Sequence, residues 1–170
     1  RFWPQFRDFL LWEMAREYSE KKRRALFSRG ALYYELKEDY AHALECYTRC
    51  GDHAKVSELL IRNAELHPGM GHYSEMEKYY RSLPEAEIAA SPALMQGMSM
   101  LCALAMDYEG SERWYHELQE FGKRCDRDDA AGKQARSRLA WLDISLPQRG
   151  VEGLTETIPA VFRLMTSKEV

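Results

Sequence analysis

The chain has 170 residues, of which 45% are apolar and 12% aromatic, which is ample for a continuous core and argues against disorder. A net charge of −3 and a pI near 6.0 leave no basic footprint for direct nucleic-acid binding. No apolar run approaches a membrane span and no signal-peptide pattern opens the chain, so we expect a cytoplasmic protein without membrane contact. Because the chain begins with Arg1 rather than Met, we expect it to be a segment of a longer protein. Uneven spacing predicts reduced thiols for the four cysteines, Cys46, Cys50, Cys102 and Cys125.

Apolar residues at helical spacing predict four helices in the first part of the chain, over 5–17, 19–37, 40–50 and 53–66. The first helix has a strongly apolar face that needs a packing partner, with Phe6, Phe9 and Leu10 on it. Capping residues mark the ends of the others: Ser19, Asp39 and Asp52 as N-caps, and Gly51 as the residue that ends the third helix. Helices joined by such short links must pack antiparallel.

The second part of the chain is predicted to be helical as well, over 72–82, 92–106, 108–125 and 130–145, with a short piece at 84–90. Ser91 and Pro92 form a strong start signal, a cap followed by a proline in the first turn. A last apolar segment runs from Val151 to Met165, and Pro159 should kink or split it.

One spacing of apolar residues occurs three times. Each copy has tyrosine at its first position, a small or apolar residue three later, and tyrosine again seven later; the copies are Tyr40–Tyr47, Tyr73–Tyr80 and Tyr108–Tyr115. They begin 33 and 35 residues apart, which matches a helix–turn–helix unit stacked on its neighbours. The sequence therefore predicts an all-α fold, a tetratricopeptide-like right-handed superhelix of helical repeats. The tyrosines are expected to fill the space between stacked helices.

The sequence offers no strong site for catalysis. The best metal candidate is the series His42, Cys46, Cys50 and His53, but its members span about 16 Å of helix, too far for one tetrahedral ion, so a packing role is favoured. Gly69–Gly71 lacks the lysine of a phosphate-binding loop, and no Gly-x-Ser-x-Gly motif occurs. We therefore expect no enzyme activity, no metal and no cofactor in these residues.

Binding is the more promising role, although the sequence alone does not orient the side chains and assigns no ligand-binding residue. An inner, concave side of the superhelix would carry it, with possible contributions from Tyr33, Tyr34, Arg62, Met95, Met98 and Trp141, of which the methionines more simply fill the core. The basic run Lys21–Arg24 is most simply a solvated helix face; contact with a nucleotide, DNA or an acidic partner is the alternative.

Several motifs resemble, in order, those of LuxR-family ATP-dependent transcriptional regulators related to the maltose-regulon activator. The opening Phe6-Arg7-Asp8-Phe9-Leu10 is similar to the segment that closes the winged-helix module of that family. The likeness extends to about residue 125 and includes five further stretches that resemble the family's first helical repeats and its next connector and helix: Ala31–Glu35, Tyr40–Leu44, Gly51–Val56, Leu83–Glu85 and Ser91–Leu94.

This resemblance implies the terminal helix of a preceding winged-helix module at 1–18 and a tetratricopeptide-like helical-repeat domain at 19–170. The segment would be a sensor that binds a small-molecule inducer or a protein partner and controls activation of the parent protein, with possible self-association of that protein. ATP hydrolysis and DNA binding would belong to other domains of the parent. The alternative is a free-standing tetratricopeptide-type adaptor for protein–protein interaction, unrelated to transcription.

Overall fold

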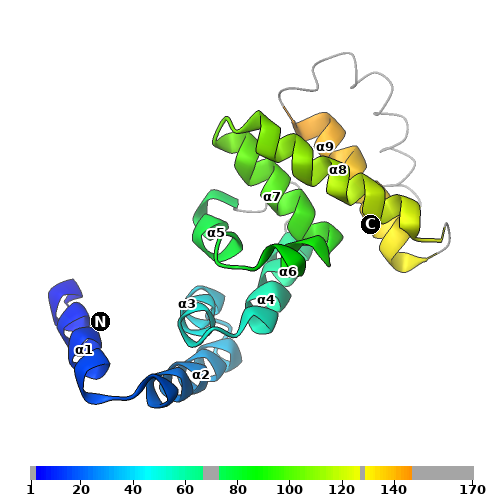
Figure 1. Ribbon diagram of the computed structural model, residues 1–170. Helices are drawn as coiled ribbons and strands as arrows, with labels where there is room; N and C mark the ends of the chain where they lie inside the picture. The colour runs from blue at the N-terminus through cyan, green and yellow to red at the C-terminus, as the bar shows by residue number, and fades with distance from the viewer. Residues whose placement is uncertain (1–2, 67–72, 127–128, 147–170) are drawn as a thin grey trace. The chain divides into compact units, whose positions relative to one another are not determined.

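A computed structural model describes residues 3–66, 73–126 and 129–146, and these residues are helical with no strand among them (Figure 1). In chain order the helices are α1 (Pro4–Glu17), α2 (Glu20–Leu36), α3 (Tyr40–Cys50), α4 (His53–Leu66), α5 (Tyr73–Tyr80), α6 (Glu85–Ala89), α7 (Pro92–Leu104), α8 (Tyr108–Arg124) and α9 (Ala130–Ser145). The chain divides into two compact units, Arg1–Val56 and Ser57–Val170, with the boundary inside α4. No helix in the described ranges is long and apolar enough to cross a membrane.

The predicted all-α class is confirmed, and the predicted helices agree with the observed ones to within two residues at each end. Ser19 accepts a hydrogen bond from the backbone N–H of Lys22, as expected of an N-cap. Ser91 precedes the proline that opens α7, but its side chain makes no capping hydrogen bond. The expected kink at Pro159, with the apolar segment around it, lies outside the described residues.

In the first unit, α2 packs against α3 around a core of small and apolar side chains: Ala31, Ala43, Leu44, Tyr47 and Val56. The apolar face of α1, which we expected to be covered, is not: no residue of this helix is buried, and Phe6 and Phe9 are 46% and 51% exposed. The reason is that α1 makes few contacts with α2, so much of its apolar face stays accessible to solvent.

Three links between consecutive helices share one geometry. Each has a residue with positive φ followed by an aspartate: Glu38 and Asp39 (φ 58°), Gly51 and Asp52 (φ 75°), and Met106 and Asp107 (φ 60°). The aspartate N–H donates to a carbonyl five residues earlier at 2.9–3.0 Å, and its carboxylate caps the following helix. Because the positive-φ residue ends each helix, α2 and α7 stop before the ends that their apolar patterns predict, residues 37 and 106.

The second unit is built around α7, which contacts α5, α6, α8 and α9. Figure 1 shows α7 and α8 running alongside each other, with α9 beside α8. Every residue from Pro92 to Ser99 is buried. Ser99 and Ser111 are fully buried at the contact of α7 with α8, where the Ser99 hydroxyl donates to the Ser111 carbonyl at 3.0 Å. Two such small side chains let the helix backbones approach closely.

The tyrosine pattern fills the core as predicted at its eighth residue and only partly at its first. Tyr47, Tyr80 and Tyr115 are at most 6% exposed. At the first position Tyr73 is buried but Tyr108 is 45% exposed, although each is the opening residue of its helix. The expectation that all six rings lie between helices is therefore wrong for Tyr108.

Candidate functional site

A buried guanidinium occupies the middle of α9. Arg138 is only 8% exposed because it lies on the same helix face as the buried Ala135 and Leu142. Its Nη1 donates a hydrogen bond to Oε1 of Gln96 on α7 at 2.6 Å, and Gln96 is itself 3% exposed. The described residues provide no carboxylate within ion-pair distance of this guanidinium, so its only hydrogen-bonding partner among them is a neutral amide. A buried charge without a directly paired opposite charge is an unusual and costly arrangement.

Two phenol groups of α5 belong to the same cluster. The rings of Tyr73 and Tyr80 pack edge to face with centroids 6.3 Å apart. Both hydroxyls are buried, and neither makes a hydrogen bond within the described part of the chain. Gly97 permits this packing, because a Cβ there would lie 2.5 Å from the Tyr80 ring and hydroxyl. Buried hydroxyls are nearly always hydrogen-bonded. Two buried hydroxyls without a partner, together with a buried cation, therefore indicate a candidate binding site for a ligand that accepts hydrogen bonds.

The electrostatics fix the protonation states of these groups. Burial raises the pKa of Tyr73 and of Tyr80, and the positive charge of Arg138 opposes this rise only in part. Burial lowers the pKa of Arg138, against the influence of the two phenols and of Glu65 on α4, but an arginine remains charged at neutral pH. The cluster therefore presents one positive charge and two neutral O–H donors. This combination suits the binding of an anion better than acid–base chemistry.

The unpartnered Tyr80 hydroxyl differs from its two counterparts in the repeat. In the first copy Tyr47 donates to Glu35 at 2.5 Å, and in the third copy Tyr115 donates to Asp143 at 2.8 Å. Tyr80 occupies the same position of the second copy, where the described residues offer no acceptor. Two of the three equivalent tyrosines thus donate a hydrogen bond to a carboxylate of their own chain. The third, Tyr80, has no such carboxylate among the described residues, and the charge that acts on its hydroxyl is the positive one of Arg138.

Comparison of the chain with protein-family models, with curated proteins and with solved structures finds no match.

Two of the four residues in the metal candidate, His42 and Cys50, make local hydrogen-bonding contacts in the first unit. His42 makes contacts of 2.8 Å from Nδ1 to the carboxylate of Asp39 and stacks on the Tyr34 ring. The Cys50 thiol donates to the Tyr47 carbonyl. Burial raises the pKa of Cys46 and of Cys50, which disfavours the thiolate that a metal requires. No group of three or more potential metal ligands occurs among the described residues.

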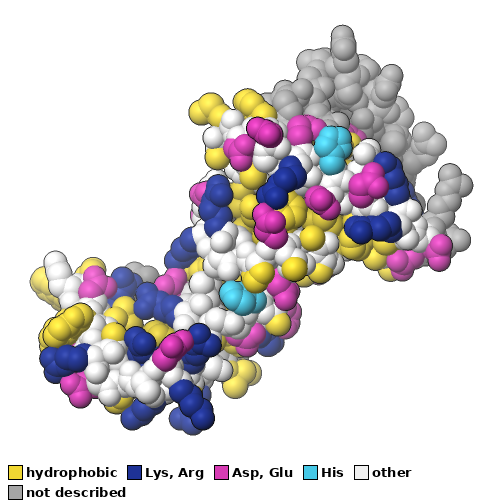
Figure 2. Space-filling model, in the orientation of Figure 1, with side chains coloured by type: hydrophobic (Ala, Val, Ile, Leu, Met, Phe, Trp, Pro, Cys, Tyr) yellow, Lys and Arg dark blue, Asp and Glu magenta, His cyan; other side chains and the backbone are white. Residues whose placement is uncertain are grey.

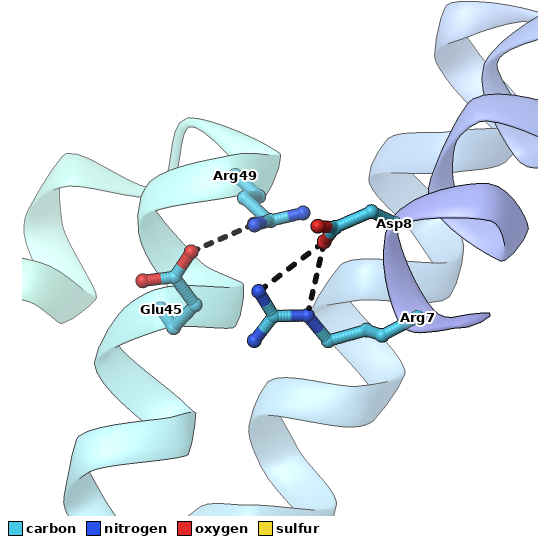
Figure 3. Close-up of polar contacts among 4 residues, drawn as sticks. All are labelled: Arg7, Asp8, Glu45 and Arg49. Atoms are coloured by element: carbon cyan, nitrogen blue, oxygen red, sulfur yellow. Dashed lines mark hydrogen bonds and ion pairs between the residues drawn. The ribbon is translucent and has the colours of Figure 1, made fainter. Parts of the chain in front are cut away.

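In the basic run on α2, Lys21, Lys22 and Arg24 are exposed and Arg23 is half-buried. The run borders a cavity of about 360 Å³, and the residues that line it are Leu11, Met14, Glu20, Arg23, Arg24, Phe27 and Arg49. Figure 2 shows Lys and Arg side chains among hydrophobic ones on this unit. Two of the three arginines that line the cavity are paired: Arg24 with Glu20 at 2.6 Å, and Arg49 with Glu45 at 2.9 Å. Figure 3 shows the second pair on α3, together with the exposed pair of Arg7 and Asp8 on α1. The solvated-face interpretation fits Lys21, Lys22 and Arg24, whereas the half-buried Arg23 departs from it.

The residues suggested for an inner binding face belong to both units and differ in their exposure. Met95 and Met98 are buried in α7 as core residues, whereas Tyr33 is 57% exposed and contacts Tyr34 in an edge-to-face arrangement. Arg62 is exposed and Trp141 is half-buried.

Sequence reasoning missed Arg138 and Gln96. The sequence did contain a sign of the pair. Arg138 is a charged residue at a buried position of α9, between Ala135 and Leu142, and Gln96 is the one long polar residue in the apolar sequence of α7.

Proposed function

We propose that the chain is a sensor segment of a cytoplasmic LuxR-type transcriptional regulator, that its helices stack as a tetratricopeptide-like right-handed superhelix, and that its second unit binds a small-molecule inducer. Binding would bias the parent protein between inactive and active states. In this proposal DNA recognition and ATP hydrolysis belong to other domains of the parent.

The observation that supports ligand binding is the cluster of Arg138, Gln96, Tyr73 and Tyr80. A small number of convergent polar groups inside an apolar environment is typical of ligand sites. The phenols are held in their protonated form by burial, so the cluster is equipped to hold and orient a ligand rather than to exchange protons with it. Regulation of transcription is supported by a different observation, the order of motifs from Phe6 to Leu94 that resembles the regulator family.

The alternative, a protein-interaction adaptor, is favoured by one feature of the first unit. Large apolar side chains on α1 and α2 are exposed, among them Trp12 at 57% and Leu36 at 77%. Exposed apolar groups of this size are typical of protein-binding surfaces when they form a contiguous patch.

A thermal-shift screen with the purified chain separates the two functions. A small molecule present at about 100 times its Kd stabilises the folded state by about 2.7 kcal/mol, which is readily measured. An inducer-binding sensor should respond to at least one member of a panel of sugars, amino acids, organic acids and aromatic compounds. A flat profile across all of them would reject small-molecule sensing and favour the adaptor. For the link to transcription, the full reading frame should encode a phosphate-binding loop and a helix-turn-helix; if both are missing, that link is wrong.

A further inference from the structure

We infer that the ligand of the second unit is a monoanionic carboxylate, whose oxygens accept hydrogen bonds from Arg138, Tyr80 and Tyr73. This inference rests on the proposed sensor function and specifies the chemistry of its ligand. In this arrangement the ligand carboxylate accepts a hydrogen bond from Tyr80, as Glu35 does from Tyr47 and Asp143 does from Tyr115.

The first argument is the internal comparison of the three copies. The hydroxyls of Tyr47 and Tyr115 each donate to a carboxylate that comes from a neighbouring helix, α2 in one case and α9 in the other. The hydroxyl of Tyr80 is fully buried and has no acceptor in the described ranges. A carboxylate bound beside Tyr80 would give the second copy the same interaction that the other two already have.

The second argument is charge. Arg138 as a whole residue is 8% exposed, and its guanidinium is hydrogen-bonded, among the described residues, only to the neutral Gln96. A planar guanidinium matches the geometry of a carboxylate, with two parallel N–H donors to two oxygens. A carboxylate bound there would give Arg138 the direct ion pair that the described residues do not provide, because Glu65 acts on it only from beyond ion-pair distance.

The same count of charges distinguishes carboxylates from phosphates. A phosphate monoester carries a charge between −1.5 and −2 at neutral pH, so it would leave excess negative charge in a buried environment. Glu65 adds further negative potential, because its charge acts on Arg138 from α4. A ligand with a single negative charge is therefore favoured over a dianion.

The small remaining exposure of the site indicates the direction of entry. Arg138 and Tyr73 are 8% and 6% exposed, whereas Tyr80 is completely enclosed. The carboxylate would thus approach past the first two side chains and reach the Tyr80 hydroxyl last. Gly97 keeps the Tyr80 ring against α7, so the hydroxyl is fixed before the ligand arrives.

The experiment measures the melting temperature of the purified chain in sodium acetate and in sodium benzoate. Acetamide, benzamide, inorganic phosphate and sodium chloride, at matched concentration and ionic strength, are the reference probes. We expect acetate or benzoate to raise the melting temperature and the reference probes to leave it unchanged. The inference is overturned if neither carboxylate acts, or if an amide or phosphate acts equally well.

Three variants link the response to this site. Gln96→Glu supplies an internal carboxylate to Arg138, and it should raise the melting temperature and abolish the response to carboxylates. Tyr80→Phe removes one donor and should weaken carboxylate affinity about tenfold, the equivalent of one hydrogen bond to a charged group. Tyr115→Phe, at the equivalent position of the third copy, is the matched control and should keep the affinity of the unmodified chain. Circular dichroism verifies that each variant is folded.

An unchanged response in both Gln96→Glu and Tyr80→Phe would overturn the assignment to this site. Failure of this inference is distinguishable from failure of the proposed function, because the wider metabolite panel tests sensing without regard to charge. If a neutral molecule stabilises the protein and carboxylates do not, the proposed sensor function is supported and the inference of a carboxylate ligand is wrong.

Discussion

Removal of the Tyr80 hydroxyl should make the unliganded protein more stable, which is the opposite of the usual effect of a core substitution. The side chain is fully buried, and its hydroxyl has no hydrogen-bond partner within the described part of the chain. Leaving a hydroxyl unsatisfied costs about 1–3 kcal/mol, whereas Tyr80→Phe keeps the ring and its packing. After a small loss of contact at the site of the missing oxygen, we expect a net gain of about 1 kcal/mol.

The equivalent substitution in the third copy should act in the opposite direction. The Tyr115 hydroxyl donates to Asp143 at 2.8 Å, and a hydrogen bond to a charged group contributes about 1.5–3 kcal/mol. Tyr115→Phe should therefore lower the free energy of unfolding by about 1–2 kcal/mol, since this bond is partly exposed to solvent. Two chemically identical changes at equivalent positions would thus have effects of opposite sign.

Urea denaturation followed by tryptophan fluorescence and by circular dichroism measures both effects. In a chain of this size a change of about 1 kcal/mol shifts the melting temperature by about 2–4 °C, so scanning calorimetry provides an independent check. The slope of the denaturation curve should be unchanged in both variants. If Tyr80→Phe destabilises the protein as much as Tyr115→Phe does, the Tyr80 hydroxyl has an acceptor in the folded protein and the reasoning fails.

Three further substitutions test other features. Gly97→Ala should cost about 1–3 kcal/mol, because the new Cβ would meet the Tyr80 ring at 2.5 Å; a stability equal to that of the unmodified chain would contradict the close contact. Met106→Gly should stabilise by about 1 kcal/mol, since a positive φ of 60° strains any side chain and this one is 77% exposed; the urea midpoint should rise. Burial and the hydrogen bond to Glu35 raise the pKa of Tyr47 from 10.0 to about 12. The folded state then holds a proton that the unfolded state has lost, so stability should fall between pH 10 and pH 12, and Tyr47→Phe should reduce this fall.

The helices were predictable from the sequence because their signals are local. Ser19, Asp39 and Asp52 cap the backbone within three residues of themselves, and Gly51 has the positive φ that glycine adopts without strain. The positive φ of Met106 was not predictable in the same way, because a non-glycine residue carries no such signal.

The candidate site depends on contacts between distant parts of the chain. Arg138 and Gln96 are 42 residues apart and meet only because α9 packs against α7. The period of the repeat predicts that Tyr80 is buried, but it does not reveal which of three equivalent hydroxyls has an acceptor. That difference depends on where Glu35 and Asp143 lie on other helices, and such information is tertiary.

The aspartate-capped links leave no spare length between the helices that they join. Inserting or deleting a single residue there would displace the cap and turn the next helix by about 100° about its own axis, since each residue advances an α-helix by that angle. Homologous genes that keep this plan should therefore diversify by exchanging side chains along the helices while the links stay constant in length. A combinatorial library aimed at new ligand specificity would follow the same rule: randomise the faces of α5, α7 and α9, and leave the connection after Leu104 untouched.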